Sequence, residues 1–357
     1  MLASKLQILF NILLYLFILL LLFQRIKIKN GRYNIIFSLL GILVFCVFSY
    51  WGGDYFHYYF SYDNSFIDTH IEPIYIFLAK NSPTYSVWRF YIWGVALIMV
   101  TKLLNKYNNS KFIIFIIFVS ISLLDFSYGR ASLSMAFLFA GYYLISIRKK
   151  TLLGFALLFC SFFFHRSAAF GIVLFFLAYI FPIKRARTLL LYAIIFIFAY
   201  FSLSDFIGSF LGYDVDYDDA MGQVVSRGQR YLEREERESG IGGLCRDVLD
   251  KIPIYLSFLL FVKIVSKKYI KNYPKDILLF SNVSFIMILI ASLLAYNTVY
   301  QTQVMYERFL QFSLIPTVIF LSYSYNNNIY RKYIRIIIIM GILSSIYTLL
   351  YAYHCAK

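Results

Sequence analysis

Long apolar stretches separated by short polar breaks dominate the sequence. We expect membrane-spanning helices near twelve of these stretches, residues 6–23, 34–51, 84–101, 112–126, 131–147, 151–164, 168–182, 188–204, 252–266, 277–295, 309–325 and 336–353. Composition agrees, because 61% of the 357 residues are hydrophobic and 15% are charged, whereas a soluble domain has about 25% charged residues. The pattern predicts an all-α, polytopic membrane protein with one transmembrane domain over residues 1–357.

Charged residues are divided unequally between alternate breaks. One set carries 21 of the 34 basic residues, so the positive-inside rule makes it cytoplasmic and places both termini outside. The net charge of +16 therefore reflects topology, and we expect no nucleic-acid partner. The other set carries seventeen of the eighteen acidic residues, and nine of its thirteen basic residues are arginine. Because arginine suits phosphate and carboxylate groups, we expect the chemistry on the outer face.

Two expected spans are too short to cross a bilayer. Residues 112–126 and 151–164 number 15 and 14, whereas about 20 are needed. Each opens a hairpin, the first with Asp125 and Arg130 at its tip and the second with His165 and Arg166. Ionisable groups at this depth are costly unless they serve a function. We infer a sunken, water-accessible site that opens outward.

Three arginines of the outer face are candidate ligands of a pyrophosphate group. Arg130 and Arg308 each precede an apolar helix, and an anion binds well at the positive end of a helix. Arg166 lies at the second hairpin tip. The alternatives are an Asp125–Arg130 pair that closes the first hairpin and a salt link between Glu307 and Arg308.

Two residues are candidate general bases. An imidazole ordinarily titrates near neutral pH, so His165 could act as a base or donate to phosphate; a structural hydrogen bond is the alternative. Asp54 is the second candidate base, and it follows a Gly-Gly pair that allows a sharp turn near the membrane. Ser167 suits the N-cap of the helix that follows His165.

Aromatic and acidic residues of the first outer loop are candidate sugar ligands. Tyr55 and Tyr58 could stack on sugar rings, and Glu72 could hold a sugar hydroxyl. The alternative is a helix C-cap followed by an interfacial aromatic belt.

The segment 205–250 is the only sizeable extramembrane piece expected from the sequence, with a short helix around residues 231–238. It is either a solvated charged segment or a lid that brings arginines over the site. The candidate lid residues are Arg227, Arg230 and Arg234.

Several of these motifs, in this order, resemble the EpsG-like family of membrane polysaccharide polymerases, which is related in role to Wzy O-antigen polymerases. The resembling elements are Gly53-Asp54-Tyr55 with Tyr58, Glu72-Pro73, Arg130, Phe164-His165-x-Ser167-Ala168, and Glu307-Arg308. They extend over residues 52–309, which is most of the chain.

The resemblance implies a function in the bacterial cytoplasmic (inner) membrane. Such proteins join oligosaccharide repeat units carried on undecaprenyl pyrophosphate at the outer face, as metal-independent glycosyltransferases without a cofactor. The partners would be the undecaprenyl-pyrophosphate-linked oligosaccharide, membrane lipid and a chain-length regulator protein. The alternatives are a lipid-linked oligosaccharide flippase or transporter, and another outer-face transferase such as an O-antigen ligase. The absence of repeated loop motifs and the nearly uncharged midplane argue against a transporter.

Overall fold

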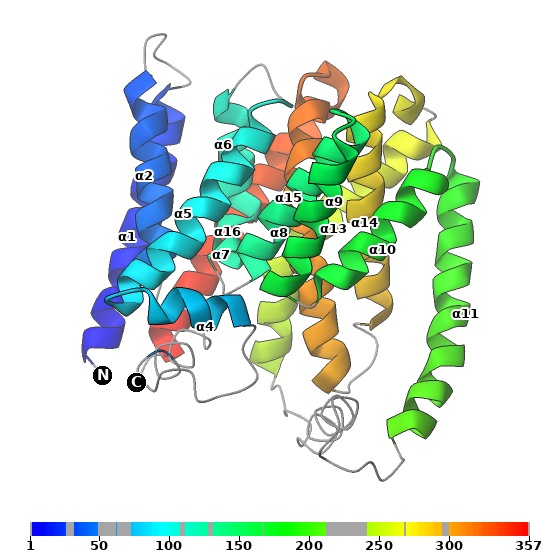
Figure 1. The fold of residues 1–357 in the computed structure, drawn as a ribbon. Coiled ribbons are helices and arrows are strands. Elements are labelled where there is room, and N and C mark those ends of the chain that lie inside the picture. Colours follow the sequence, from blue (N-terminus) through cyan, green and yellow to red (C-terminus); the bar gives the residue numbers. More distant parts are fainter. Residues whose placement is uncertain are drawn as a thin grey trace.

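The computed structural model is built from helices (Figure 1). It describes residues 2–25, 32–48, 62, 73–107, 111–127, 131–165, 167–211, 241–267, 269–294 and 300–355. The helices are α1 (Leu2–Arg25), α2 (Arg32–Phe48), α4 (Pro73–Lys80), α5 (Tyr85–Leu104), α6 (Lys111–Ile121), α7 (Leu123–Phe126), α8 (Ala131–Ser146), α9 (Thr151–Phe164), α10 (Ala168–Ile180), α11 (Ala186–Leu211), α13 (Ile241–Ser266), η1 (Tyr269–Asn272), α14 (Lys275–Leu294), α15 (Tyr300–Tyr325) and α16 (Asn328–Cys355).

Every stretch that the hydrophobic pattern marks as a span contains a helix, which confirms an all-α, polytopic membrane protein. Four described helices combine the length and hydropathy of a full span, namely Lys5–Phe23, Tyr85–Leu104, Lys275–Ser292 and Asn328–His354. Six further apolar helical stretches have 10–17 residues. The expected span 112–126 is broken at Ser122 into α6 and α7, and the short helix α4 was not expected.

The non-helical part of the expected extramembrane segment 205–250 is shorter than the sequence pattern indicates. The helix α11 continues to Leu211 and α13 begins at Ile241, so both ends of the expected segment 205–250 are helical. Residues 212–240, which include the expected surface helix, lie outside the described part of the chain.

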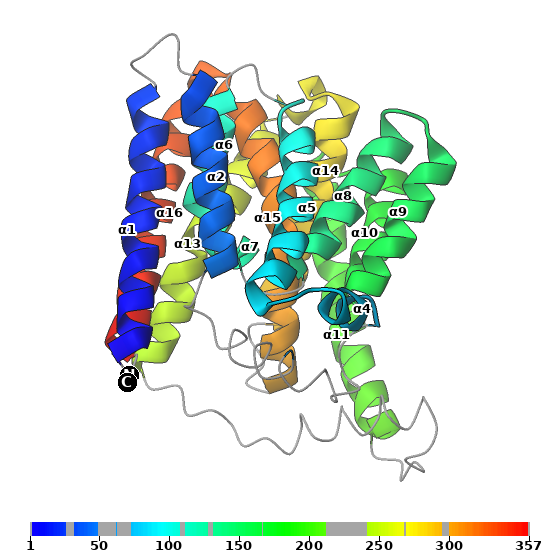
Figure 2. The ribbon, with the colours of Figure 1, turned by 60° about the vertical axis from the view of Figure 1, so that its left-hand side comes forward.

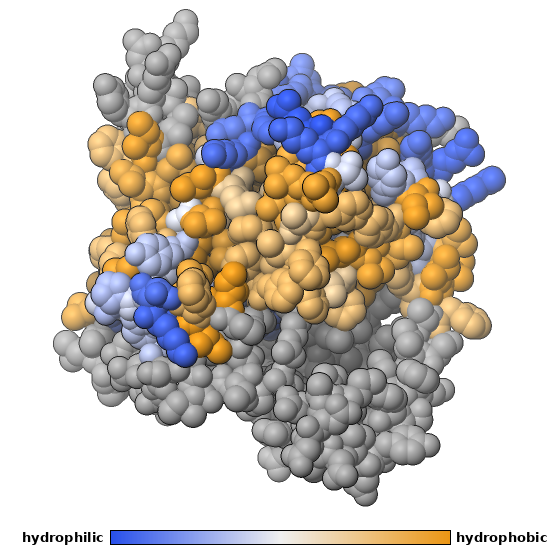
Figure 3. All heavy atoms as spheres, in the orientation of Figure 1, coloured by the Kyte–Doolittle hydropathy of each residue, from blue (hydrophilic) through white to orange (hydrophobic). Residues whose placement is uncertain are grey.

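Five of the loops that carry the basic clusters, as far as the structure describes them, lie together at one end of the bundle, the basic end (Figures 1 and 3). They flank the ends of α5, α8, α10, α13 and α15. Hydrophilic residues gather on this end above a broad hydrophobic belt (Figure 3). Both termini lie at the opposite end, the far end, as two views show (Figures 1 and 2). The division of basic loops and termini between two sides, which the charge pattern predicts, therefore agrees with their positions in the bundle.

The hairpin tips are recessed from the far end. The helices α11, α13 and α15 have 26 residues each, whereas α9 has 14 and α10 has 13. At 1.5 Å per residue, 14 residues extend about 21 Å, which is roughly 9 Å less than a hydrocarbon core of ~30 Å. In both ribbon views the turn between α9 and α10 lies closer to the middle of the bundle than the far-end turns of α11 and α15 (Figures 1 and 2).

Close helix packing holds the short helices in place. A Cβ atom at Gly154 of α9 would overlap the side chain of Ile145, and one at Gly141 of α8 would lie 3.0 Å from the main-chain oxygen of Gly154. Small residues thus let α8 and α9 approach closely, as is common between membrane helices. A buried Ser284–Thr317 hydrogen bond of 2.6 Å joins α14 to α15 at the centre of the bundle.

Candidate functional site

The tip of the first hairpin carries an ion pair with a distant helix. Asp125, in α7, accepts from Nζ of Lys251, in α13, at 3.1 and 3.2 Å to its two carboxylate oxygens. The two residues are 126 positions apart in the chain. The Lys251 side chain is 10% exposed and that of Asp125 is 25% exposed. The pair is therefore mostly shielded from solvent, and each charge depends on the other at this depth.

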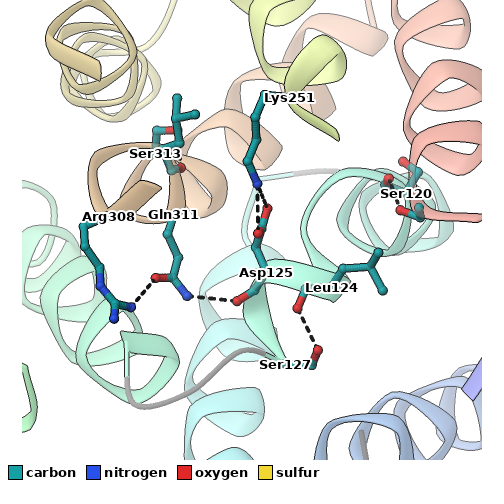
Figure 4. A network of polar contacts seen from close by, with 10 residues as sticks. Ser120, Leu124, Asp125, Ser127, Lys251, Arg308, Gln311 and Ser313 are labelled. Carbon is teal, nitrogen blue, oxygen red and sulfur yellow. Dashed lines mark hydrogen bonds and ion pairs between the residues drawn. The ribbon is translucent and has the colours of Figure 1, made fainter. Parts of the chain in front are cut away.

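A glutamine connects the same tip to Arg308. Gln311 of α15 donates from Nε2 to the main-chain oxygen of Asp125 at 3.0 Å. Its Oε1 accepts from the Arg308 guanidinium at 3.1 Å (Figure 4). Arg308 and Gln311 are three residues apart and so share one face of α15. Hydrogen bonds thus run from the hairpin tip through an amide to a half-buried arginine.

The position of Arg308 within its helix differs from the position that the sequence predicted. The helix α15 begins at Tyr300, so Arg308 lies about two turns inside it, and the prediction of a helix N-terminal position was wrong. Within the described part of the chain, Arg308 forms no ion pair, and the suggested link to Glu307 is not made. Adjacent residues of a helix point in different directions, and Glu307 is exposed. No carboxylate of the described residues therefore neutralises the Arg308 guanidinium.

The backbone of the first tip is held by several helices. Trp93 of α5 donates from Nε1 to the main-chain oxygen of Phe126 at 3.1 Å, and the Ser132 hydroxyl of α8 donates to the same oxygen. Arg89, which is 3% exposed, lies over the Trp93 ring and donates to the main-chain oxygen of Cys46 at 2.8 Å. Together with α13 and α15, four helices fix the position of this tip.

The second hairpin tip meets the same helix. His165 is buried and follows α9 directly, and its ring centroid lies 6.2 Å from that of Phe312 in α15. Phe312 is four residues after Arg308, so both lie on one side of α15. The first hairpin tip and His165 therefore both contact the stretch of α15 that carries Arg308. The sequence predicted that both hairpin tips are recessed, and the structure brings them together.

A hydrogen bond constrains the imidazole of His165. Its Nδ1 accepts from the main-chain N–H of Ser167 at 3.2 Å. In a neutral histidine, the nitrogen that accepts is unprotonated and the other carries the proton. The geometry thus assigns an N–H donor to Nε2. Ser167 occupies the expected N-cap position of α10, but its side chain makes no capping hydrogen bond.

The remaining predicted site residues lie outside the described part of the chain. They are Asp54, Tyr55, Tyr58, Glu72, Arg130, Arg166, Arg227, Arg230 and Arg234. Ser127 and Ala131, which border the gap that contains Arg130, are both buried. Lys251 and Gln311 were not among the predicted site residues. The sequence contained one indication of Lys251. This lysine lies at the outer edge of the expected span 252–266, on the same expected side of the membrane as Asp125.

A hollow of about 530 Å³ lies at the basic end rather than near Arg308. Its lining is neutral, with tyrosine, asparagine and serine side chains from η1 and the residue after it, from the end of α15, and from the turn between α15 and α16. Burial raises the pKa of the Tyr273 hydroxyl, which forms a 2.8 Å hydrogen bond with Ser324. Without a charged lining, this hollow does not fit the expected pyrophosphate group.

The sequence profile of the EpsG family matches residues 48–357, which is most of the chain. The chain belongs to the EpsG family. No curated protein and no solved structure matches it. Membership of the EpsG family supports a membrane polysaccharide polymerase-type role and a glycosyltransferase-like activity. The region matched by the EpsG profile includes both hairpin tips, Lys251 and the part of α15 that carries Arg308.

Proposed function

We propose that this protein joins oligosaccharide repeat units carried on undecaprenyl pyrophosphate at the outer face of the bacterial cytoplasmic membrane. The observation that carries the proposal is the position of Arg308. Its guanidinium is half-buried, bonded to a neutral amide and recessed beside two hairpin tips. A lipid-linked pyrophosphate lies at headgroup depth, where such a cation meets it, and membership of the EpsG family supplies the reaction class.

The reaction moves charge onto the pyrophosphate. A sugar hydroxyl of the acceptor unit attacks the anomeric carbon of the donor chain, a new glycosidic bond forms, and the bond from that carbon to the pyrophosphate oxygen breaks. The pyrophosphate leaves with the bonding electrons and gains negative charge. A positioned cation in a partly dry site stabilises that charge more than it stabilises the substrate. Arg308 has this role in the proposal, with Arg130 and Arg166 as further cations and with no metal ion.

The acceptor hydroxyl loses its proton in this reaction. His165 was the preferred base on sequence grounds, but its Nδ1 accepts a main-chain N–H, which makes Nε2 a donor. We therefore assign to His165 a hydrogen bond to the leaving phosphate oxygens, and to Asp54 the role of base. Tyr55, Tyr58 and Glu72 would hold the sugars, and arginines 227, 230 and 234 would belong to the lid.

The test is the length distribution of surface glycans in cells that lack the protein and express variants at equal levels. Arg308→Ala should remove long chains and leave a single repeat unit attached to its acceptor. Arg308→Lys should restore part of the activity because it keeps the charge but loses the planar fork. Arg187→Ala, an exposed arginine at the basic end, is the matched control and should keep the normal ladder.

Two other outcomes would contradict the proposal. A normal ladder with Arg308→Ala would exclude this residue from the reaction. Loss of every repeat unit from the surface in cells without the protein would favour a flippase or a ligase.

A chain-length regulator protein remains an expected partner, and its removal should change the ladder's mean length without abolishing polymerisation.

A further inference from the structure

Two cations near the first hairpin tip are bonded in different ways. Lys251 is bonded to a carboxylate, whereas Arg308 is bonded to the amide oxygen of Gln311. Both connections end on Asp125, the first at its side chain and the second, through Gln311, at its main-chain oxygen (Figure 4). The tip therefore anchors Arg308 without placing a carboxylate on it.

This arrangement has an electrostatic consequence. A carboxylate bonded to Arg308 would neutralise the guanidinium and compete with any anion that approaches it. An amide oxygen fixes the guanidinium through a single acceptor and leaves its net charge at +1. Lys251 has a complementary effect, because it neutralises the one carboxylate that the described tip residues carry. The charge of Arg308 is thus preserved at a depth where a free cation is costly.

Burial and spacing make Gln311 suited to this role. Gln311 is 6% exposed, and it is bonded at both ends of its amide. Its orientation is fixed, since the amide nitrogen donates to a main-chain oxygen and only the oxygen can then accept from Arg308. Phe312, the next residue, is in ring contact with His165. A shift of Gln311 would move Arg308 relative to the second hairpin tip.

We propose that Gln311 is a positioning residue for an anion site, in which it aligns Arg308 for a phosphate or pyrophosphate group while Lys251 keeps Asp125 from competing. The identification of that group with the lipid-linked donor rests on the proposed function. The site itself requires only that Arg308 binds a phosphate-type anion and that Gln311 determines its affinity.

Two substitutions separate charge from position. Gln311→Glu keeps the size and shape but places a carboxylate on Arg308, so it should weaken anion binding strongly. Gln311→Met keeps the volume, which buried sites tolerate best, but removes both hydrogen bonds and leaves Arg308 unaligned. Gln7→Glu makes the same chemical change at an exposed position of α1 and is the matched control.

The assay measures the affinity of the purified protein, in lipid nanodiscs, for inorganic pyrophosphate, from the rise in unfolding temperature with ligand concentration. Arg308→Ala and Gln311→Glu should each weaken binding about 10- to 100-fold, the range for a lost hydrogen bond to a charged group. Gln311→Met should weaken it on the order of 10-fold, and Gln7→Glu should bind as the unmodified protein does. The unfolding temperature without ligand checks that each variant is folded.

The outcomes distinguish this inference from the proposed function. If Arg308→Ala loses pyrophosphate binding but Gln311→Glu and Gln311→Met retain it, Gln311 does not position the arginine, and the inference is wrong while the proposed function stands. If the Gln311 variants lose binding but cells expressing Arg308→Ala keep a normal glycan ladder, the anion site exists and the proposed function is wrong. If Gln311→Met does not fold, Gln311→Glu alone decides.

Discussion

Breaking the Asp125–Lys251 pair should destabilise the protein, and the double substitution should cost much less than the sum of the two single effects. The two N–O distances of 3.1 and 3.2 Å and the low exposure of both side chains describe a mostly buried pair. Removing one partner of a buried pair costs roughly 3–5 kcal/mol, and the partial exposure of Asp125 favours the lower part of this range. We expect about 3 kcal/mol for Lys251→Met, which removes the lysine from a mostly buried carboxylate, and about 2 kcal/mol for Asp125→Asn, because the lysine can extend its ammonium toward water.

The double variant removes both charges and should cost only about 2 kcal/mol, so the coupling between the two positions is about 3 kcal/mol. The free energy of unfolding can be measured by titration with sodium dodecyl sulfate in mixed micelles, with circular dichroism as the readout. Lys267→Met, at an exposed lysine of the basic end, is the control and should change stability by less than about 0.5 kcal/mol. Additivity of the two single effects within about 0.5 kcal/mol would show that the ion pair does not contribute, and would refute the reasoning.

Three further predictions concern the imidazole, helix packing and sidedness. His165→Gln, whose amide can replace the Nε2 donor, should retain more polymerisation than His165→Asn; equal loss in the glycan-ladder assay would favour a general base. Gly154→Ala should destabilise by about 1–3 kcal/mol relative to Gly94→Ala, whose added methyl meets open space, since both share the gain in helix propensity; equal unfolding free energies would contradict this. In a cysteine-free background, an impermeant maleimide added to intact cells should label Glu307→Cys and not Asn327→Cys, which lie near opposite ends of α15; the reverse would invert the topology.

The elements of the fold could be predicted because the bilayer imposes a simple pattern. A spanning helix needs a long apolar stretch, and loops on the two sides differ in charge. Helix boundaries were less predictable: α15 begins at Tyr300 rather than near residue 309, because its polar first turns include glutamine and glutamate, which are good helix formers. The break at Ser122 and the helix α4 left no signature in the hydrophobic pattern.

The depth of the candidate site could be predicted from the sequence, but the contacts between its residues could not. Span length alone indicated that the tips with Asp125 and His165 are recessed, since a short helix cannot reach the far side of the bilayer. The partners of these residues depend on how each helix is rotated and on which helices are neighbours. Neither quantity is encoded in a one-dimensional pattern of apolar residues.

By itself, the sequence determined that the protein is a helical membrane protein, that its basic loops share one end, and that the hairpin tips with Asp125 and His165 are recessed. The tertiary structure decided that Lys251 bonds to Asp125, and that Gln311 joins the tip to Arg308. The physical reason is that burial energy depends on the composition of each segment, whereas a hydrogen bond depends on the positions of two atoms that distant segments bring within about 3 Å of each other.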